Sequence, residues 1–408
     1  MSAPGRPSDQ GTRARPEGTS ASPAGPLAGV RVVEFAGIGP GPLAGMLLAD
    51  LGAQVIRLDR VEPSGMGIER PPRFDLTLRS KRTLKVDLKR EAGRHVALEI
   101  VRRADVLIEG FRPGTMERLG LGPEPCLRDN PRLVYGRVTG FGQEGTLAQA
   151  AGHDLNYIAL TGALHAIGRD GQPPTPPLNL LGDYAGGSML LVMGLLAGLL
   201  HARATGQGQV VDAAMIDGVG ALMAPFFGLQ AAGLHDGPRG TNLLDSGAPF
   251  YDVYRCACGG HVSVAPIEPK FRAVLLARLR EAGADVEGLP AFDDRARWPE
   301  LRSRLAAIFA QRARDEWCRA LEGSDACFAP VLSLREAPGH AHHASRGSFV
   351  EVDGVAQPAP APRFSATLLG VPLPPGRAGD ARDWARAWGV PADSLAVLQA
   401  LDVPAQPD

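Results

Sequence analysis

The stretch "GVRVVEFAGIGPGPLAGMLLADLGAQVIRLDR", residues 29–60, constrains the fold more than any other part of this sequence. Its pattern predicts a strand, a turn rich in glycine and proline, a helix and a second strand. Two strands joined through a helix pair in parallel, because the crossover returns the chain to the same end of the sheet. We therefore expect a β-α-β unit that begins a parallel sheet in an α/β protein.

Further units of the same kind follow along the chain. The pattern predicts strands at 83–89, 105–111 and 132–142, a helix at 91–104, and then a helix at 186–203 with a strand-like segment at 208–217. Strands that alternate with helices are typical of a doubly wound sheet. We expect a Rossmann-like large domain made of residues 26–225 together with 345–408.

The pattern changes after this region. "FYDVYRC" and "HVSVAP" predict an antiparallel hairpin turned at Gly259 and Gly260, and residues 268–323 carry charge at helical spacing. These features predict a smaller α+β domain at 245–335. From about residue 345 the chain is rich in proline, which favours an extended strap over the surface. Residues 1–25 hold mainly Pro, Gly, Ser and Arg, and we expect a disordered tail there.

Charge and composition limit the partners. The chain has 408 residues and 43 basic against 44 acidic side chains, so no global field attracts nucleic acid or anionic lipid. Five cysteines without CxxC spacing favour neither a disulfide framework nor a thiol metal site, and we expect a reducing, cytoplasmic location. The longest apolar run, 188–201, is too short to cross a bilayer and predicts a buried helix. We expect no secretory leader and no membrane partner.

The glycine and proline turn raises the possibility of a nicotinamide cofactor, with Asp59 on its ribose. A dinucleotide fingerprint needs G-x-G-x-x-G, and prolines remove amides that would hold a pyrophosphate. Here glycine alternates with proline: Gly37, Gly39, Pro40, Gly41 and Pro42. The pattern favours a turn that lets a ligand or another backbone approach closely.

Basic side chains recur near the ends of the predicted strands. They are Arg60, Arg79, Lys81, Arg82, Lys89 and Arg112. Ligands of open α/β sheets bind outside the carboxyl ends of the strands, so these cations could hold a phosphorylated ligand. A solvated surface is the alternative. The absence of acidic partners at helical spacing favours the ligand.

Three residues are candidates for acid and base chemistry. His153 follows Gly152 at the edge of an apolar segment, although a histidine hydrogen-bonded in a core is the commoner case. Asp183 precedes a predicted helix, where it could be an N-cap, and a helix start also stabilises nearby negative charge such as an enolate oxygen. Glu268 lies between two prolines, with a surface salt bridge as its alternative. The histidines of "HAHH", 340–343, lack i, i+4 spacing and predict an exposed loop rather than a metal site.

Six segments together resemble the α-methylacyl-CoA racemase family, within the class III CoA-transferase superfamily. They are residues 29–60, "IEGFRPGTMERLGLGPE", "AGHDLNYIALTGALHAIG", "PPLNLLGDYAGGSMLLVMGLLAGLL", "GQGQVVDAAMIDG" and "PIEPKF". The resemblance covers about residues 26–370. The segment 68–82 is longer than expected for the family, and residues 1–25 have no counterpart in it.

The resemblance implies that His153 and Asp183 are the two acid/base residues and that Glu268 hydrogen-bonds His153. It also implies an interlocked homodimer, with each active site between the large domain of one subunit and the small domain of the other. It implies no metal and no separate cofactor, since CoA is part of the 2-methylacyl-CoA substrate. The implied CoA contacts are Ile38, Arg60, Val86, Asp87, Leu88, Lys89, Gly110, Phe111, Arg112, Arg118, Gly152, Asp154, Leu155, Asn156 and Tyr157.

The chemistry that the resemblance implies is racemisation at the carbon next to the thioester. A base on one face removes the proton, an acid on the other returns one, and the enolate between them is stabilised. The rival is a CoA-transferase, in which Asp183 attacks the thioester and forms a mixed anhydride. Such enzymes use a mobile glycine-rich loop, and the matching segment "RGTNLLDSGAPF" has no glycine run. A third alternative is a CoA-binding protein without activity.

Overall fold

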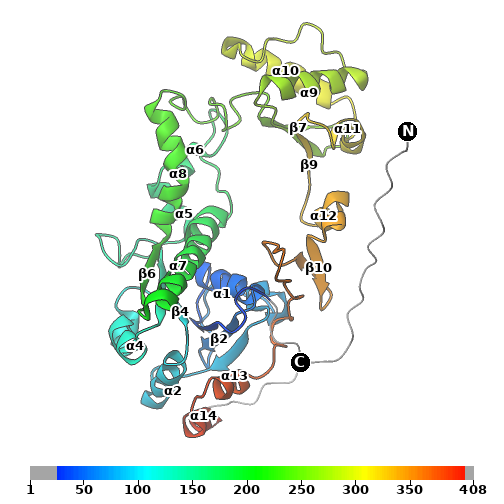
Figure 1. The fold of residues 1–408 in the computed structure, drawn as a ribbon. Coiled ribbons are helices and arrows are strands. Elements are labelled where there is room, and N and C mark those ends of the chain that lie inside the picture. Colours follow the sequence, from blue (N-terminus) through cyan, green and yellow to red (C-terminus); the bar gives the residue numbers. More distant parts are fainter. Residues whose placement is uncertain (1–24, 400–408) are drawn as a thin grey trace, which may run out of the picture.

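The computed structural model of the chain describes residues 25–399. The expected disordered tail, residues 1–25, lies outside this range except for its last residue. Figure 1 shows a body built on a sheet, and a smaller group of helices and strands joined to it by extended segments.

The larger body is a six-stranded sheet in the order β3-β2-β1-β4-β5-β6, with every neighbouring pair parallel. Its strands are β1 (Arg31–Phe35), β2 (Gln54–Asp59), β3 (Arg82–Lys85), β4 (Val106–Glu109), β5 (Val134–Thr139) and β6 (Gln209–Ala214). The strand order reverses direction between β1 and β4, as in doubly wound α/β proteins. The predicted parallel α/β architecture is confirmed.

Two predicted strands end earlier than expected. The strand predicted at 83–89 ends at Lys85, because the Asp87 side chain accepts the Lys89 N–H at 2.9 Å and turns the chain. The strand-like segment 208–217 ends at Ala214, and Met215 begins a helix. The strand positions themselves agree with the prediction.

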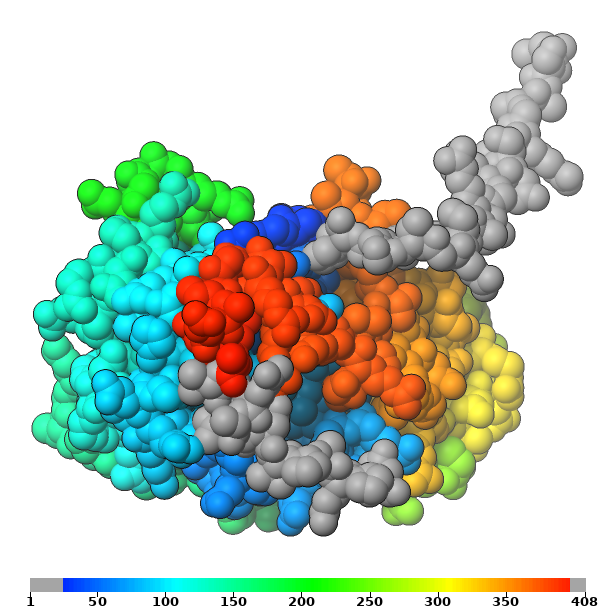
Figure 2. Space-filling model, turned by 90° about the horizontal axis from the view of Figure 1, so that it is seen from below, coloured from blue at the N-terminus to red at the C-terminus, as the bar shows by residue number. Residues whose placement is uncertain are grey.

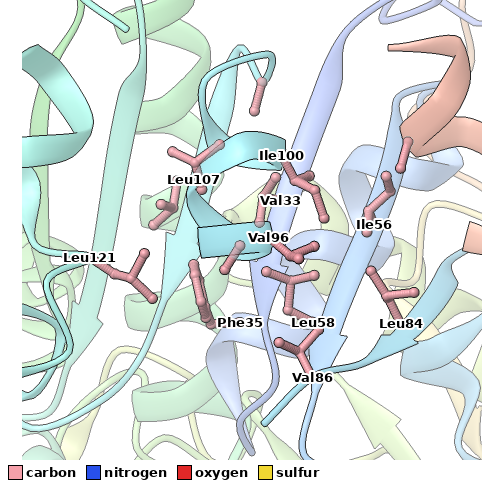
Figure 3. Packing of buried hydrophobic residues seen from close by; sticks show 14 of the residues in the cluster. Val33, Phe35, Ile56, Leu58, Leu84, Val86, Val96, Ile100, Leu107 and Leu121 are labelled. Atoms are coloured by element: carbon pink, nitrogen blue, oxygen red, sulfur yellow. The ribbon is translucent and has the colours of Figure 1, made fainter. Parts of the chain in front are cut away.

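The sheet is covered on both faces. Along β1, Val32 and Val33 point to opposite sides and belong to different apolar clusters. Figure 3 shows one cluster, where Ile100 of α2 (Glu91–Val101) lies among the side chains of β1, β2 and β3. The other cluster holds α1 (Pro40–Asp50) and α7 (Leu190–Thr205). The remaining helices of this body are α3 (Thr115–Arg118), α4 (Pro123–Asp129), α5 (Asp154–Leu160), α6 (Ala163–Ala166) and α8 (Met215–Ala231).

The helix predicted at 186–203 begins earlier, as a π-helix η3 (Leu180–Met189) that continues into α7. The run Leu180–Thr205 has 26 residues and contains an 18-residue window with a mean hydropathy of 1.7, so it could cross a membrane by length and composition. The expectation drawn from the shorter segment 188–201 is therefore wrong on length. Leu191, Leu195 and Leu199 are buried and pack one face of the run against the sheet. A core helix has the same features.

A second apolar core lies in the smaller body. The predicted hairpin is present as β7 (Asp252–Arg255) and β8 (His261–Val264), and an unpredicted third strand, β9 (Phe328–Val331), pairs with β8. The helices α9 (Pro269–Glu281), α10 (Trp298–Phe309) and α11 (Arg314–Leu321) pack on this sheet through a cluster that includes Phe309 and Trp317. Short 3-10 turns, Pro72–Phe74, Leu76–Leu78, Arg295–Arg297 and Ala337–Gly339, complete the regular structure.

The C-terminal segment returns to the larger body. The predicted strap contains α12 (Ala341–Arg346), a hairpin of β10 (Phe349–Val352) and β11 (Val355–Pro358), and the helices α13 (Ala381–Ala387) and α14 (Ala392–Gln399). Only residues 359–380 resemble the expected extended chain. Apolar residues near the C-terminus explain the difference, because Ala385, Trp388 and Leu395 pack in the cluster of α2. In Figure 2 the red C-terminal part lies against the blue and cyan N-terminal part.

Candidate functional site

Nine of the fifteen predicted CoA contacts follow the ends of strands at one edge of the sheet. Ile38 follows β1, Arg60 follows β2, Val86–Lys89 follow β3, and Gly110–Arg112 follow β4. Because the strands are parallel, all four positions lie at the carboxyl edge. β1 and β4 flank the point where the strand order reverses, which is where ligands of open α/β sheets bind.

The side chains at this edge differ in exposure. Arg60, Lys89, Arg112 and Arg118 are exposed, and Ile38 is 43% exposed. Val86 packs in the core with 2% exposure, so only its backbone can face a ligand. Gly110 is exposed, and Asp87, Leu88 and Phe111 are half-buried.

Two of the predicted phosphate-binding cations are instead buried. Arg79 forms an ion pair with Asp50, and its Nη1 also donates to the Gln357 side chain at 2.9 Å. Lys81 pairs with Glu34, and both side chains are fully buried. These acidic partners lie on other elements of the fold, where helical spacing cannot reveal them.

Arg82 also has another role than the one predicted. Its guanidinium lies 4.1 Å from the centre of the Trp384 ring and donates to the Asp380 carbonyl at 2.9 Å. Arg82 therefore fastens α13 to the edge strand β3. Of the six predicted cations, Arg60, Lys89 and Arg112 are the ones exposed at the carboxyl edge.

The glycine and proline turn lies against Asp183. Gly39 has a φ of +67°, and a Cβ at this position would come within 3.0 Å of Asp183 Oδ2. Pro40 then begins α1. The turn does allow a close approach, but the neighbour is the Asp183 carboxylate of η3 rather than a ligand or another backbone. Asp59, the predicted ribose ligand of the dinucleotide alternative, pairs with Arg57 and Lys85.

The backbone around His153 is held from both sides. His153 is the extended N-cap of α5, and its N–H donates to Asn156 Oδ1 at 3.0 Å, while its side chain is exposed. The Tyr157 hydroxyl donates to the Gly152 carbonyl. A Cβ on Gly152 would meet the Tyr157 ring at 2.8 Å, so the packing of this ring requires a glycine here, and the CoA contact at Gly152 stays a prediction.

Asp183 lies inside the first turn of η3, and Asn179 is the N-cap, so the predicted capping role of Asp183 is wrong. Burial raises the pKa of Asp183. A hydrogen bond from Asn179 Nδ2 at 3.1 Å lowers this pKa, the charge of Asp154 raises it, and His153 lowers it. The net direction is upward, so this carboxyl is a stronger base than an ordinary aspartate.

The π-helical geometry of η3 depends on close backbone contacts. A Cβ on Gly187 would come within 2.9 Å of Pro40 Cβ, and one on Gly186 within 2.7 Å of a Val219 methyl. The Ser188 hydroxyl is buried, donates to the Pro40 carbonyl at 2.9 Å and lies 3.1 Å from the Asp183 carbonyl. These contacts join η3 to α1 and α8, and they place Asp183 beside the turn that precedes α1.

Asp154 does not offer its side chain to a ligand. It is 5% exposed, and its Oδ2 accepts the N–H of Asp183 at 2.7 Å. Leu155 and Asn156 are exposed on the same helix. The CoA contact at Asp154 stays a prediction, and it would have to involve the backbone of this residue.

Glu268 lies apart from His153 within one chain. It is the exposed N-cap of α9 beside the second core, and no hydrogen bond or ion pair joins it to His153 among residues 25–399. The predicted bond between them stays a prediction for the dimer. The histidines at 340–343 are not in a loop, because α12 contains His342 and His343, and His340 is its N-cap, 2.7 Å from Glu322. The described part of the chain has no group of three or more His, Cys, Asp or Glu side chains that could hold a metal.

The chain matches the description "CoA-transferase family III" over residues 27–379. The chain belongs to this family. It is 46% identical to an α-methylacyl-CoA racemase of Mus musculus over 343 residues, which cover 84% of this chain and 87% of the mouse protein. It is 44% identical to an α-methylacyl-CoA racemase of Homo sapiens, over 82% of this chain and 86% of the human protein.

A solved structure of a related protein supports the fold. The CAIB/BAIF family protein from Brucella suis aligns with a TM-score of 0.76 and 25% identity, covering 89% of this chain and 99% of that protein. The present chain thus shares the architecture of the Brucella suis protein over most of its length.

Some residues of the site were missed from the sequence. Asn179 precedes Asp183 by four residues, a spacing that places both on one face of a helix and could have indicated the hydrogen bond. The contact of Gly39 with Asp183 joins residues 144 positions apart, and no local signal could have found it.

Proposed function

We propose that the chain is an α-methylacyl-CoA racemase, which interconverts (2R)- and (2S)-2-methylacyl-CoA thioesters by a 1,1-proton transfer. The observation that carries this proposal is the pairing of an exposed histidine, His153, with a carboxyl of raised pKa, Asp183, close enough for His153 to influence that pKa. Asp183 lies beside the turn that follows β1 at the carboxyl edge of the sheet, where the proposed CoA contacts also lie, and the residue after His153 contacts Asp183.

The reaction needs two groups with different tasks. The proton next to a thioester is weakly acidic, so the base that removes it must be placed close to it and have a raised pKa. In one direction Asp183 takes the proton and the protonated His153 returns one on the other face. In the other direction the roles are reversed. Each positioned proton transfer contributes roughly 10²- to 10⁴-fold in rate.

The CoA moiety would bind along the carboxyl edge. Arg60, Lys89, Arg112 and Arg118 present exposed positive charge there, and guanidinium groups suit the phosphates of CoA. Ile38 offers apolar surface between β1 and α1. These residues do not specify which acyl chain the substrate carries, because apolar pockets discriminate weakly among branched chains.

An interlocked homodimer is part of the proposal. The helical run that carries Asp183 and the neighbouring α8 expose large apolar side chains, among them Met193 (61%), Leu200 (70%) and Phe227 (55%). An apolar surface of this kind is typical of an interface. In such a dimer Glu268 of one subunit would reach His153 of the other, hold its tautomer and increase its basicity.

A CoA-transferase is the alternative within the same family. It would use Asp183 as a nucleophile and need a mobile loop over the intermediate. In the matching segment, Asp245 accepts the N–H groups of Gly240, Asn242 and Gly247 at 2.9, 2.8 and 3.2 Å. A loop tied by these bonds favours the racemase.

Proton exchange in D₂O tests the proposal. The purified protein is incubated with a single enantiomer of a 2-methylacyl-CoA, without an acceptor acid, and deuterium incorporation and optical rotation are followed. The racemase predicts both incorporation and racemisation, and both disappear in His153→Ala and Asp183→Ala. No exchange, with CoA transferred to an added carboxylic acid and lost only in Asp183→Ala, would establish the transferase. No activity of either kind would favour a binding protein.

The dimer is tested by mixing subunits. A preparation of His153→Ala and a preparation of Glu268→Ala are each expected to be inactive or strongly impaired. Unfolding and refolding them together produces mixed dimers, and one of the two sites then receives an intact His153 and an intact Glu268. Recovered activity supports Glu268 acting across the dimer, and no recovery contradicts it.

A further inference from the structure

Asp154 is a buried carboxylate that the proton-transfer chemistry does not use directly. It is the first residue of α5, follows His153 in the chain, and is 5% exposed. Its Oδ2 accepts the Asp183 N–H, whereas its Oδ1 is buried and has no hydrogen-bond partner among the described residues. No cation forms an ion pair with it in the described part of the chain. Its one hydrogen bond is therefore directed at the backbone of the proposed base.

We propose that Asp154 is a positioning residue for Asp183: it fixes the backbone turn that carries Asp183 and holds a negative charge beside the Asp183 carboxyl. This inference rests on the proposed function, because it gives Asp154 a role in the basicity of a proton-transfer group. It differs from the CoA contact that the sequence implied, since the Asp154 side chain would touch Asp183 and not the substrate.

The first part of the role follows from the helix. The N–H groups in the first turn of a helix have no acceptor within it, and Asp183 is the fourth residue of η3. Asp154 supplies the missing acceptor at 2.7 Å. The fit is tight, because a Cβ on Gly182 would come within 2.7 Å of the same Oδ2. Asp154 and Gly182 together leave the Asp183 backbone one position.

The second part follows from the charges around Asp183. The titratable groups that face it come from α5 and its N-cap: His153, Asp154 and Tyr157. From α1 it meets the backbone at Gly39. Other ionisable groups of the helices that pack on η3, namely Asp50, Asp217, His201 and Arg203, are not among the groups that shift its pKa.

These charges act in opposite directions. The charge of Asp154 raises the pKa of Asp183, whereas the Asn179 hydrogen bond and His153 lower it. Asp154 therefore keeps Asp183 basic enough to accept a proton from carbon while His153 is beside it.

Two substitutions separate the anchor from the charge. Asp154→Asn retains an oxygen that can accept the Asp183 N–H and removes the charge, whereas Asp154→Ala removes both. Asp212→Asn is the matched control, because Asp212 also accepts a backbone N–H, from Gln143 at 3.2 Å, on β6. Circular dichroism checks that each variant is folded.

The readout is the pH profile of kcat/KM for proton exchange, measured from each enantiomer. Loss of the Asp154 charge lowers the pKa of Asp183. In the direction that uses Asp183 as the base, the acid limb moves to lower pH in Asp154→Asn. In the other direction, where Asp183 must be protonated, the alkaline limb moves to lower pH. Asn179→Ala moves both limbs to higher pH, because it removes a hydrogen bond that lowers this pKa.

The Asp154→Ala variant adds the loss of position. We expect kcat to fall about tenfold or more at every pH, with KM for the thioester within about twofold, because misplacing a catalytic group lowers the rate without weakening binding. A large rise in KM with unshifted limbs would overturn the inference and restore the CoA contact. A pH profile with unshifted limbs in Asp154→Asn would also overturn the inference about Asp154. As long as the wild type exchanges the proton, the proposed racemase function would still stand. Failure of the wild type to exchange would refute the proposed function instead.

Discussion

The buried pair of Lys81 and Glu34 gives the sharpest prediction about stability. Both side chains are fully buried, and Lys81 Nζ also donates to the Pro42 carbonyl in the first turn of α1 at 2.7 Å. In Lys81→Met, Glu34 keeps one cation, Arg57, whose Nε lies 3.8 Å from Oε1. Removing one member of a buried pair costs about 3–5 kcal/mol, because it leaves an uncompensated charge. For a body of this size the thermal midpoint should fall by roughly 6–20 °C.

The pH dependence has a definite sign. Burial raises the pKa of Glu34 above its ordinary value of 4.5 in the folded chain, and loss of Lys81 removes a charge that lowers it. The folded state then binds more protons than the unfolded state above the ordinary pKa, so stability falls as the pH rises through this window. The difference between wild type and Lys81→Met is therefore smallest near pH 4 and grows toward neutral pH.

The double variant Glu34→Gln, Lys81→Met is the control. It contains neither charge, and replacing both members of a buried pair is often nearly neutral. Urea unfolding followed by circular dichroism, at several pH values, measures the free energy of unfolding of all three proteins. A loss below about 1 kcal/mol in Lys81→Met, or a double variant as unstable as the single one, would refute this reasoning.

Two further predictions concern the site. Gly39→Ala should lower kcat in the exchange assay about tenfold or more, with KM little changed. The alanine Cβ would lie 3.0 Å from Asp183 Oδ2, and the φ of +67° at this position is strained for alanine. Gly37→Ala is the control and should be near wild type, because a Cβ on Gly37 would have nothing within 4 Å. Tyr157→Phe should lower the free energy of unfolding in urea by about 1 kcal/mol and lower kcat, because it removes the hydrogen bond to the Gly152 carbonyl. Burial is the main reason why the pKa of Tyr157 is raised to about 12, so the hydroxyl remains a donor at ordinary pH. Full retention of kcat would contradict a positioning role for Tyr157.

The sequence could predict the parts of the fold that depend on local pattern. The β-α-β unit at 29–60 and the hairpin near Gly259 and Gly260 show their period and turn residues directly, and the structure contains both. The resemblance in "GHD" and "GDYAGG" located the residues of the candidate site in the chain.

Long-range contacts were beyond this kind of prediction. Arg79 and Lys81 looked like free cations, because Asp50 and Glu34 reach them only through the packing of the sheet. The π-helical start of η3 depends on glycines that meet Pro40 and Val219, and these are residues of other helices. Asp154 was placed among ligand contacts because the motif shows that it lies near the site without showing where its side chain points.

The return of the C-terminal segment to α2 affects the order in which the chain can fold during synthesis. The apolar cluster that contains α2 also contains Ala381, Ala385 and Leu395, which are made about 280 residues after α2 itself. The whole second core is made in between. The smaller body can therefore fold on the ribosome while one side of α2 is still exposed. Chains truncated after residue 358 lack the segment that covers this side, so we expect aggregation to be most sensitive to truncation there.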